Sequence, residues 1–375
     1  MTVFLCDHCR HLLFFENVWC VGCTRRLAFL PDLGVLASLD RSADGGDTFT
    51  TPIPRAVGRR YKPCVNDTWY RVCNWAVPAD DPNGLCESCR LTRVIPDLSW
   101  PDNVSRWGRL EAAKRRLVYT LRALGLPLRN RFDDPAGGLA FDFLTDPADP
   151  GLPHILTGHA DGVVTVNLAE ADDAERERRR VNLNEPFRTL IGHLRHEVGH
   201  YFWDRLVRDD TPRLAAFRRL FGDDRQDYTT ALQRHYAAGP PADWDIRCVS
   251  AYATMHPWED WAESFAHYLH LTDALQTAAA GGVSIRPSRP GEPAAVGMPD
   301  PFAVPTPSFD AMLVGWHALA YLLNNLNRGL GLPDGYPFVL NAPAVAKLRF
   351  VHATVTAAAG RGTMPTPAPP TDSAP

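Results

Sequence analysis

The sequence lacks several features that would assign it to common functional classes. No segment approaches the run of about 20 apolar residues that a membrane-spanning helix needs, so no membrane span is expected. The N-terminus has neither the basic start nor the long apolar stretch of a secretion signal, which favours a cytoplasmic location. An excess of positive charge is also missing. The formal net charge of -4 gives the chain as a whole no attraction for nucleic acid or anionic lipid.

Composition divides the chain into three parts. Residues 1–98 are rich in cysteine, tryptophan, proline and turn-forming residues, and they show little helical periodicity. Residues 104–358 carry several helical hydrophobic patterns and few strand patterns. Residues 359–375 are rich in proline, threonine and alanine, and we expect them to be disordered. We therefore predict an α+β protein with a small β domain stabilised by metal, followed by a mainly helical domain with a small sheet.

Hydrophobic periodicity and turn signals predict the elements of the second part. Helices are expected over about residues 104–124, 185–207, 257–271, 308–328 and 342–356. Asn184 is a suitable N-cap for the second of these helices. Two short strands are expected within residues 154–168, around residues 158–162, and Val163–Val166 is the clearest of them. Residues 281–307 hold many glycines and prolines and form a long connection, and whether it covers a cleft as a lid stays open.

The cysteines form two groups. Eight of the nine lie before residue 90, and clustered thiols in a reducing cytosol are better explained as metal ligands than as disulfides. The first group contains two Cys-x2-Cys pairs and has the spacing of a zinc ribbon: Cys6, Cys9, Cys20 and Cys23. The second group has only one such pair: Cys64, Cys73, Cys86 and Cys89. We predict one structural zinc ion in each group, and we expect Cys248 to be a small buried residue.

The segment His196-Glu197-Val198-Gly199-His200 carries the main candidate site. Two histidines four residues apart lie on one face of a helix, where both imidazoles can bind one zinc ion. Glu197 follows His196 directly, so its side chain is rotated around the helix axis from the metal-binding face. This position suits a general base that acts on water without binding the metal. The metzincin class is excluded, because the position of its third histidine is occupied by Leu206.

A third zinc ligand is expected further along the chain. Glu259 begins the predicted helix at Pro257, and Glu263 lies on the same helical face. We predict that Glu259 binds the catalytic zinc, while Glu263 accepts the remaining N–H of a ligand histidine. His267 and His270 stay open as ligands, cleft residues or structural groups. Asp204 is a weaker candidate for a hydrogen-bond partner of a ligand, and a salt bridge to a neighbouring arginine is the alternative.

At these motifs the sequence resembles zinc metallopeptidases of the gluzincin type. The runs 192–201, 250–252 and 256–263 are similar to a bacterial family of zinc-binding metallopeptidases with an N-terminal zinc-ribbon region. The resemblance covers about residues 3–356, nearly the whole chain. The Glu-x-x-Ala-Glu arrangement also resembles the catalytic domain of anthrax lethal factor, in which a tyrosine seven residues before the glutamate ligand stabilises the transition state. The matching position is Tyr252.

The resemblance implies hydrolysis of peptide bonds in a peptide or protein substrate by a zinc-activated water. Glu197 would act as general base and Tyr252 as oxyanion stabiliser. By analogy with the family fold, Val163–Val166 would form an edge strand on which an extended peptide aligns. The expected cofactors are one catalytic and two structural zinc ions.

Charge indicates what the cysteine region binds. Residues 1–98 contain 11 basic and 11 acidic residues, and each zinc with four thiolates adds a charge of about -2. A filled region of negative charge matches phosphate poorly, so a protein partner or a role in presenting substrate is expected rather than nucleic acid. Two alternative functions remain: an adaptor protein whose zincin domain no longer cuts, and hydrolysis of a non-peptide amide.

Overall fold

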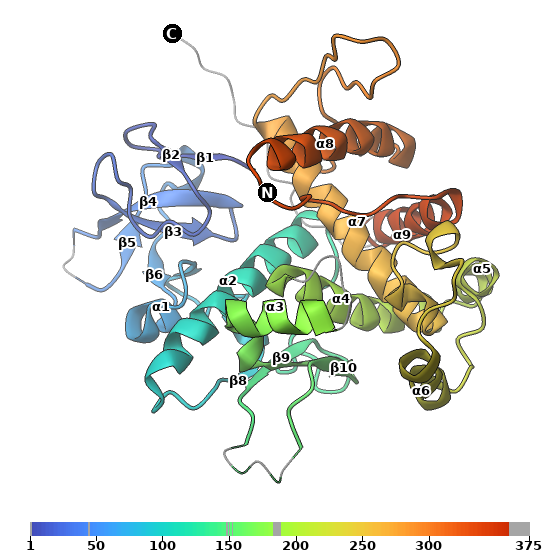
Figure 1. Cartoon of the computed structure of the whole chain (residues 1–375). Helices are drawn as coiled ribbons and strands as arrows, with labels where there is room; N and C mark the ends of the chain where they lie inside the picture. Colours follow the sequence, from blue (N-terminus) through green and yellow to red (C-terminus); the bar gives the residue numbers. More distant parts are fainter. Residues whose placement is uncertain are drawn as a thin grey trace.

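The computed structural model describes residues 2–43, 46–147, 149, 151, 153–182 and 189–359 (Figure 1). The expected cap Asn184 and residues 360–375 of the expected tail lie outside the described residues. Helices make up most of the regular structure after residue 100, and small sheets make up most of it before, so the predicted α+β class is confirmed. No helix in the described part of the chain combines the length and the apolar run that crossing a bilayer requires.

The cysteine-rich region consists of two small antiparallel sheets and one short helix. A hairpin joins β1 (Phe4–Leu5) to β2 (Leu12–Leu13). A second sheet has the order β3-β4-β5-β6-β7, with strands Arg26–Leu30, Val35–Arg41, Phe49–Thr50, Tyr61–Pro63 and Ala76–Pro78. The helix α1 (Val65–Tyr70) connects β6 to β7. Aromatic rings in edge-on and tilted contacts fill the space between these sheets and the next helix, namely Phe15, Phe29, Trp75 and Tyr119.

A four-stranded sheet links the two regions. Its order is β10-β11-β9-β8, with strands Gly158–Ala160, Val163–Asn167, Ala140–Leu144 and Thr92–Val94. The strand β8 ends the cysteine-rich region, yet it pairs in parallel with β9 of the helical region. A two-residue turn at Asp161 and Gly162, both with positive φ, joins β10 to β11, as hairpins with twisted strands require.

The expectation that Val163–Val166 forms an edge strand is wrong. These residues belong to β11, which has β9 on one side and β10 on the other. The edge at this side of the sheet is β10. The reason is the parallel pairing of β11 with β9, which leaves the first strand of the hairpin outermost.

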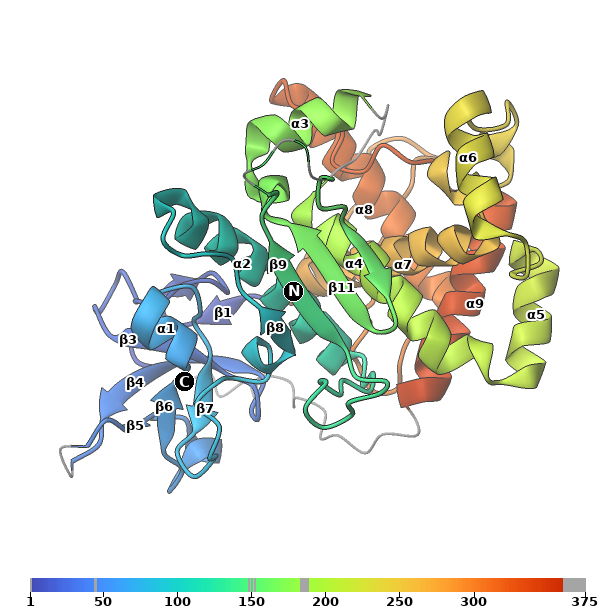
Figure 2. The same cartoon turned by 90° about the horizontal axis from the view of Figure 1, so that it is seen from below.

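Three long helices form the core of the second region (Figures 1 and 2). They are α2 (Pro101–Ala123), α4 (Leu190–Trp203) and α7 (Pro257–Ala280). The strands β10 and β11 pack on α4, and α7 packs on its other side (Figure 2). Most buried apolar side chains of the two regions form one continuous cluster, which extends from Phe4 to Val355.

The described part of the second region contains further helices, namely α3 (Asp173–Asn182), α5 (Thr211–Phe221), α6 (Tyr228–Ala238), α8 (Phe309–Gly329) and α9 (Ala342–Ala359). Of these, α5, α8 and α9 pack against α7. The helix α4 continues into one π-helical turn, Asp204–Arg208. The helix α7 runs nine residues beyond the expected end at Leu271, because no glycine or proline interrupts it before Gly281.

Residues 281–307 connect α7 to α8 at the end of α7 that lies opposite Glu259 (Figure 1). Ile285 and Ala295 form a bridge and pack with Ala318 of α8. Along a helix rising 1.5 Å per residue, Gly281 lies roughly 33 Å from Glu259. The connection therefore packs on α8, and these contacts do not make it a lid at the start of α7.

Candidate metal centre

The two histidines of the candidate site lie on α4, where this helix touches α7 most closely. Thr189 caps α4, because its hydroxyl accepts a hydrogen bond from Gly192 N at 3.0 Å. Gly199 lets the helices approach, since a Cβ at this position would lie 3.0 Å from Ala262 Cα. Trp261 Nε1 donates to the carbonyl of Gly199 at 2.8 Å, which fixes the register of α7 against α4.

Glu259 meets both histidines at this contact. His256 caps α7 and Pro257 starts it, so Glu259 lies in the first turn, where a carboxylate is favoured. Its Oε2 atom is 2.9 Å from His196 Nε2 and 3.4 Å from His200 Nε2. The carboxylate is almost fully buried. Burial alone would raise the pKa of Glu259, but the two histidines outweigh burial and hold this pKa well below its usual range.

Glu263 lies behind His196, one helical turn after Glu259. Its Oε1 atom accepts from His196 Nδ1 at 2.7 Å, and its Oε2 atom accepts from Ser250 Oγ at 2.5 Å. Burial would raise the pKa of Glu263, but the hydrogen bond and charge of His196 lower it to about 2. With Nδ1 committed to Glu263, the Nε2 atom of His196 faces Glu259 Oε2. This arrangement is the one that the spacing of Glu259 and Glu263 predicts.

The donor set fits zinc. His196, His200 and Glu259 each offer one atom, and these atoms lie within 4.8 Å of one another. Two imidazole nitrogens and one carboxylate oxygen are a common set for catalytic zinc, which leaves a vertex for water. No lysine or arginine forms a hydrogen bond or ion pair with Glu259 in the described part of the chain. A buried carboxylate whose basic neighbours are two histidines, with no lysine or arginine, is suited to sharing a metal ion with them.

The proposed catalytic groups border this set. Glu197 is half-buried on α4. Tyr252 lies on the turn Tyr252–Thr254, with its ring 5.9 Å from the His196 ring. Burial is the main cause of the raised pKa of Tyr252, followed by the charge of Glu259, and Glu197 contributes too. The phenol therefore keeps its proton at neutral pH and can donate a hydrogen bond.

Sequence reasoning missed three groups at the site. Tyr228 donates its phenol to Glu259 Oε1 at 2.9 Å. The Trp258 ring lies 3.7 Å from the His200 ring, and His159 of β10 lies 6.0 Å from it. No local spacing relates Tyr228 or His159 to the ligands. Only Trp258, next to Glu259 in the sequence, could have been suggested by its position.

The weaker ligand candidates have other partners. His267 Nδ1 lies 2.6 Å from the Tyr336 hydroxyl, and burial lowers the pKa of His267 to about 4. His270 contacts Arg195 at 2.5 Å. Asp204 forms an ion pair with Arg208 at 3.1 Å. None of the three belongs to the described group that converges on Glu259.

Each cysteine group gathers its four sulfurs within 4.8 Å, and all the cysteines are free thiols. In the first group, Sγ–Sγ distances are 3.7 Å for Cys6–Cys23 and 3.5 Å for Cys9–Cys20. In the second, both distances from Cys73, to Cys86 and to Cys89, are 3.7 Å. A tetrahedral zinc with bonds of about 2.3 Å separates its sulfurs by about 3.8 Å, so both groups fit zinc.

The two groups differ in exposure. The second group is wholly buried, and backbone N–H groups point at its sulfurs, such as Cys86 N at 3.3 Å from Cys64 Sγ. Arg115 of α2 is buried beside it and donates to the carbonyl of Val72 at 2.5 Å. In the first group, Cys9 is exposed. Cys248 is buried, as expected, and lies 3.4 Å from Lys347 Nζ.

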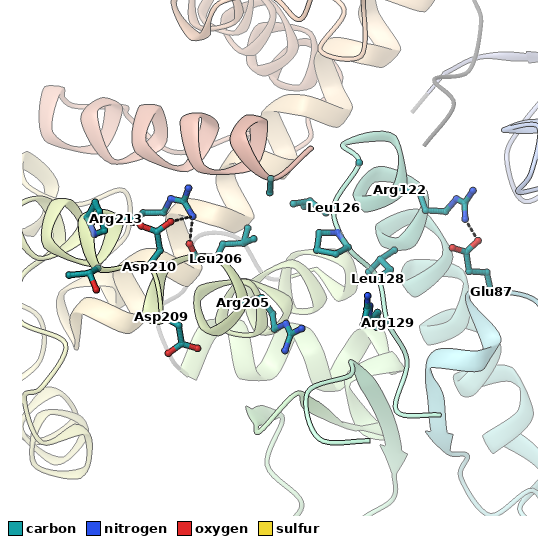
Figure 3. A pocket seen from close by; sticks show the side chains of 15 residues that line it. Glu87, Arg122, Leu126, Leu128, Arg129, Arg205, Leu206, Asp209, Asp210 and Arg213 are labelled. Carbon is teal, nitrogen blue, oxygen red and sulfur yellow. Dashed lines mark hydrogen bonds and ion pairs between the residues drawn. The ribbon is translucent and has the colours of Figure 1, made fainter. Parts of the chain in front are cut away.

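A cavity of about 960 Å³ lies away from His196, His200 and Glu259 (Figure 3). The end of α2, the loop after it and the π-helical turn after α4 form its walls, and Arg205 and Arg129 point toward it. A second cavity, of about 690 Å³, adjoins residues 253–257 behind the start of α7. Neither cavity is lined by His196, His200 or Glu259, so the site is defined by its donor atoms.

Comparisons with known proteins agree with this division. A family described as "Putative zinc-binding metallo-peptidase" matches residues 103–354, and a zinc-ribbon domain family matches residues 3–100. The chain is 42% identical over 355 residues to an uncharacterized protein of Mycobacterium bovis and, equally, to uncharacterized proteins of two Mycobacterium tuberculosis strains. Each match covers 95% of this chain and 95% of the relative. No solved structure matches. The similarity to the lethal factor domain stays a prediction.

Proposed function

We propose that this chain, which belongs to the zinc-binding metallo-peptidase family that matches residues 103–354, hydrolyses peptide bonds at a gluzincin-type zinc site. One observation carries the proposal: the Nε2 atoms of His196 and His200 converge on a single buried oxygen of Glu259. Two imidazoles and one carboxylate are the protein ligands of a hydrolytic zinc with an open vertex.

Each residue then has a defined task. His196, His200 and Glu259 would hold the ion, and Glu263 would fix the tautomer of His196 through its 2.7 Å hydrogen bond. When bound, zinc supplies Lewis acidity, which polarises a carbonyl and lowers the pKa of a water to about 7. Glu197 takes the proton of the attacking water and delivers it to the leaving amine. Tyr252 donates its phenol to the oxygen on which negative charge develops.

An extended substrate fits the free edge of the sheet. The strand β10 is the outermost strand, and it packs on α4, which carries the two histidines. His159 of β10 has its ring 6.0 Å from the His200 ring, so this edge passes directly beside the site. A peptide that adds to β10 by main-chain hydrogen bonds would present its backbone to Glu197.

The cysteine groups support a stoichiometry of three zinc ions, one catalytic and two structural. Free thiols in both groups suit the reducing cytoplasm that we propose as the location. The first zinc ribbon, with its exposed Cys9, is our candidate surface for a protein partner or for presenting substrate. We propose no nucleic-acid partner and no membrane association.

The Glu197→Gln substitution tests the hydrolytic function. This variant should keep three zinc ions and its fold but lose hydrolysis of casein or a peptide library. Glu177→Gln, an exposed change on α3, is the matched control and should leave hydrolysis unchanged. If the wild type hydrolyses casein and the peptide library no better than Glu197→Gln does, the result would reject the proposed peptidase and favour the adaptor function. Hydrolysis of non-peptide amides without hydrolysis of peptides would favour the non-peptide alternative.

A metal count tests the site independently. Substituting both His196 and His200 by alanine should lower the zinc content from three ions to two. A content of two ions in the wild type that the double substitution leaves unchanged would refute the catalytic assignment, whatever the cysteine groups bind.

A further inference from the structure

The two oxygens of the Glu259 carboxylate have different partners. Oε2 faces the Nε2 atoms of His196 and His200, while Oε1 accepts a hydrogen bond from the Tyr228 phenol at 2.9 Å. We propose that Tyr228 is a positioning residue that keeps Glu259 a ligand through one oxygen only. This inference rests on the proposed function, because it assumes a zinc ion at this site.

The number of oxygens that Glu259 supplies decides how many vertices remain. A carboxylate that binds through one oxygen, together with two imidazoles, leaves the fourth vertex of a tetrahedral zinc for water. A carboxylate that binds through both oxygens takes an additional position and crowds that vertex. The Tyr228 hydrogen bond occupies Oε1, while Oε2 is the oxygen that faces the histidines. The phenol thereby favours the arrangement that hydrolysis needs.

The chain holds Tyr228 in place from two sides. Tyr228 is the first residue of α6, and Asp227 caps that helix by accepting from Thr230 N at 2.7 Å. Its ring packs against the ring of His256 at 5.5 Å and that of Trp258 at 6.0 Å. These contacts surround the ring on the face of α7 that carries Glu259.

His256 ties Tyr228 and Glu259 to a common point. Its Nδ1 atom accepts from Trp258 N at 3.1 Å and so caps α7. The proton must then be on Nε2, which donates to the carbonyl of Gln226 at 3.1 Å. One imidazole therefore holds the start of the helix that carries Glu259 and the backbone two residues before Tyr228. This link explains how residues 31 positions apart keep a 2.9 Å hydrogen bond.

The Tyr228→Phe substitution tests the role, because it keeps the packed ring and removes only the hydroxyl. Cobalt(II) replaces zinc as a probe, since its visible absorption is strong in four-coordinate sites and weak in five-coordinate ones. The cysteine groups would bind cobalt as well, because their four thiolates suit it. A difference spectrum between each protein and its own version lacking His196 and His200 isolates the bands of this site.

Tyr228→Phe should weaken and shift the isolated cobalt bands, as expected when Glu259 binds through both oxygens. It should also lower kcat about 10- to 100-fold while KM stays unchanged. Tyr321→Phe, an exposed tyrosine of α8, is the control and should change neither. A purely structural role for Tyr228 would alter the melting temperature but not the spectrum of the folded protein.

The outcomes separate this inference from the proposed function. Unchanged cobalt bands in Tyr228→Phe would overturn the positioning role even if the enzyme is active. Altered bands in Tyr228→Phe, together with a wild type that does not hydrolyse peptides, would support the role of Tyr228 and reject the peptidase. Absence of histidine-dependent bands in the wild type would overturn both the metal site and the role of Tyr228.

Discussion

Gly199→Ala should disturb the site by separating the two helices that carry its ligands. The Cβ atom added at Gly199 would lie 3.0 Å from Ala262 Cα, 3.2 Å from Ala262 O and 3.3 Å from Phe265 Cβ. Two of these atoms belong to the backbone of α7, so the clash cannot be relieved by rotating a side chain. The helices must move apart by a few tenths of an ångström.

The cost follows from two opposing terms. Overpacking of this kind lowers the free energy of unfolding by about 1–3 kcal/mol, while alanine in place of glycine within a helix raises it by about 1 kcal/mol. The net destabilisation is then about 0–2 kcal/mol. Zinc affinity should respond more strongly, because metal–ligand distances tolerate changes of only about 0.2 Å. The displacement moves Glu259 against both histidines, and we expect zinc affinity at this site to fall about 10-fold.

Gly108→Ala is the matched control. In α2 the new Cβ would lie 3.4 Å from Val72 Cγ1, an ordinary contact, so this variant should gain about 1 kcal/mol of stability. Zinc competition with a chelator and thermal melting of both variants provide the comparison. If Gly199→Ala is stabilised as much as Gly108→Ala and binds zinc like the wild type, close packing of α4 on α7 does not set the geometry of the site.

Three further perturbations have definite expected results. Glu263→Ala removes the partner of His196 Nδ1, and zinc affinity at this site should fall about 10- to 100-fold in chelator competition. Lys347→Met leaves the buried Asp260 without its cation and should cost about 3–5 kcal/mol in unfolding experiments, part of which Asp260→Asn should restore. Arg115→Leu removes the buried cation beside the second cysteine group, so a chromogenic chelator should extract that zinc faster than in the wild type; equal extraction rates would contradict a charge-compensating role.

The parts of the site that follow local rules could be predicted from the sequence. The spacing of four residues places His196 beside His200 on α4, and the same spacing places Glu259 beside Glu263 on α7. The spacing within each helix does not predict that α4 and α7 contact each other. That contact depends on Gly199 and on packing between segments about 60 residues apart, which the resemblance to a family suggested.

Non-local pairing explains what sequence reasoning missed. The periodicity of Val163–Val166 identifies a strand, but the position of that strand within the sheet depends on β9 and β10. Tyr228 reaches Glu259 only because residues 209–256 return the chain to the start of α7. A single tyrosine without a motif carries no signal of such a contact.

The second cysteine group shows why spacing rules fail locally. Cys64 lies just before α1, and Cys73 follows the left-handed residue Arg71 that ends this helix. A short helix therefore takes the place of the usual two-residue knuckle, while Cys86 and Cys89 keep the standard spacing. The four sulfurs converge all the same, because Cys86 N donates to Cys64 Sγ at 3.3 Å.

The buried second cysteine group and the candidate metal centre are connected through α2. Arg115 of α2 binds the carbonyl next to Cys73, and Thr120 of the same helix donates to Asp273 of α7 at 2.6 Å. Asp273 in turn forms an ion pair with Arg195, which directly precedes His196 on α4. Because these contacts are buried and follow one another from residue to residue, the cysteine-rich region helps to support the helices that carry the candidate metal centre. A ribbon that only recruited partners would not need to share its core with them.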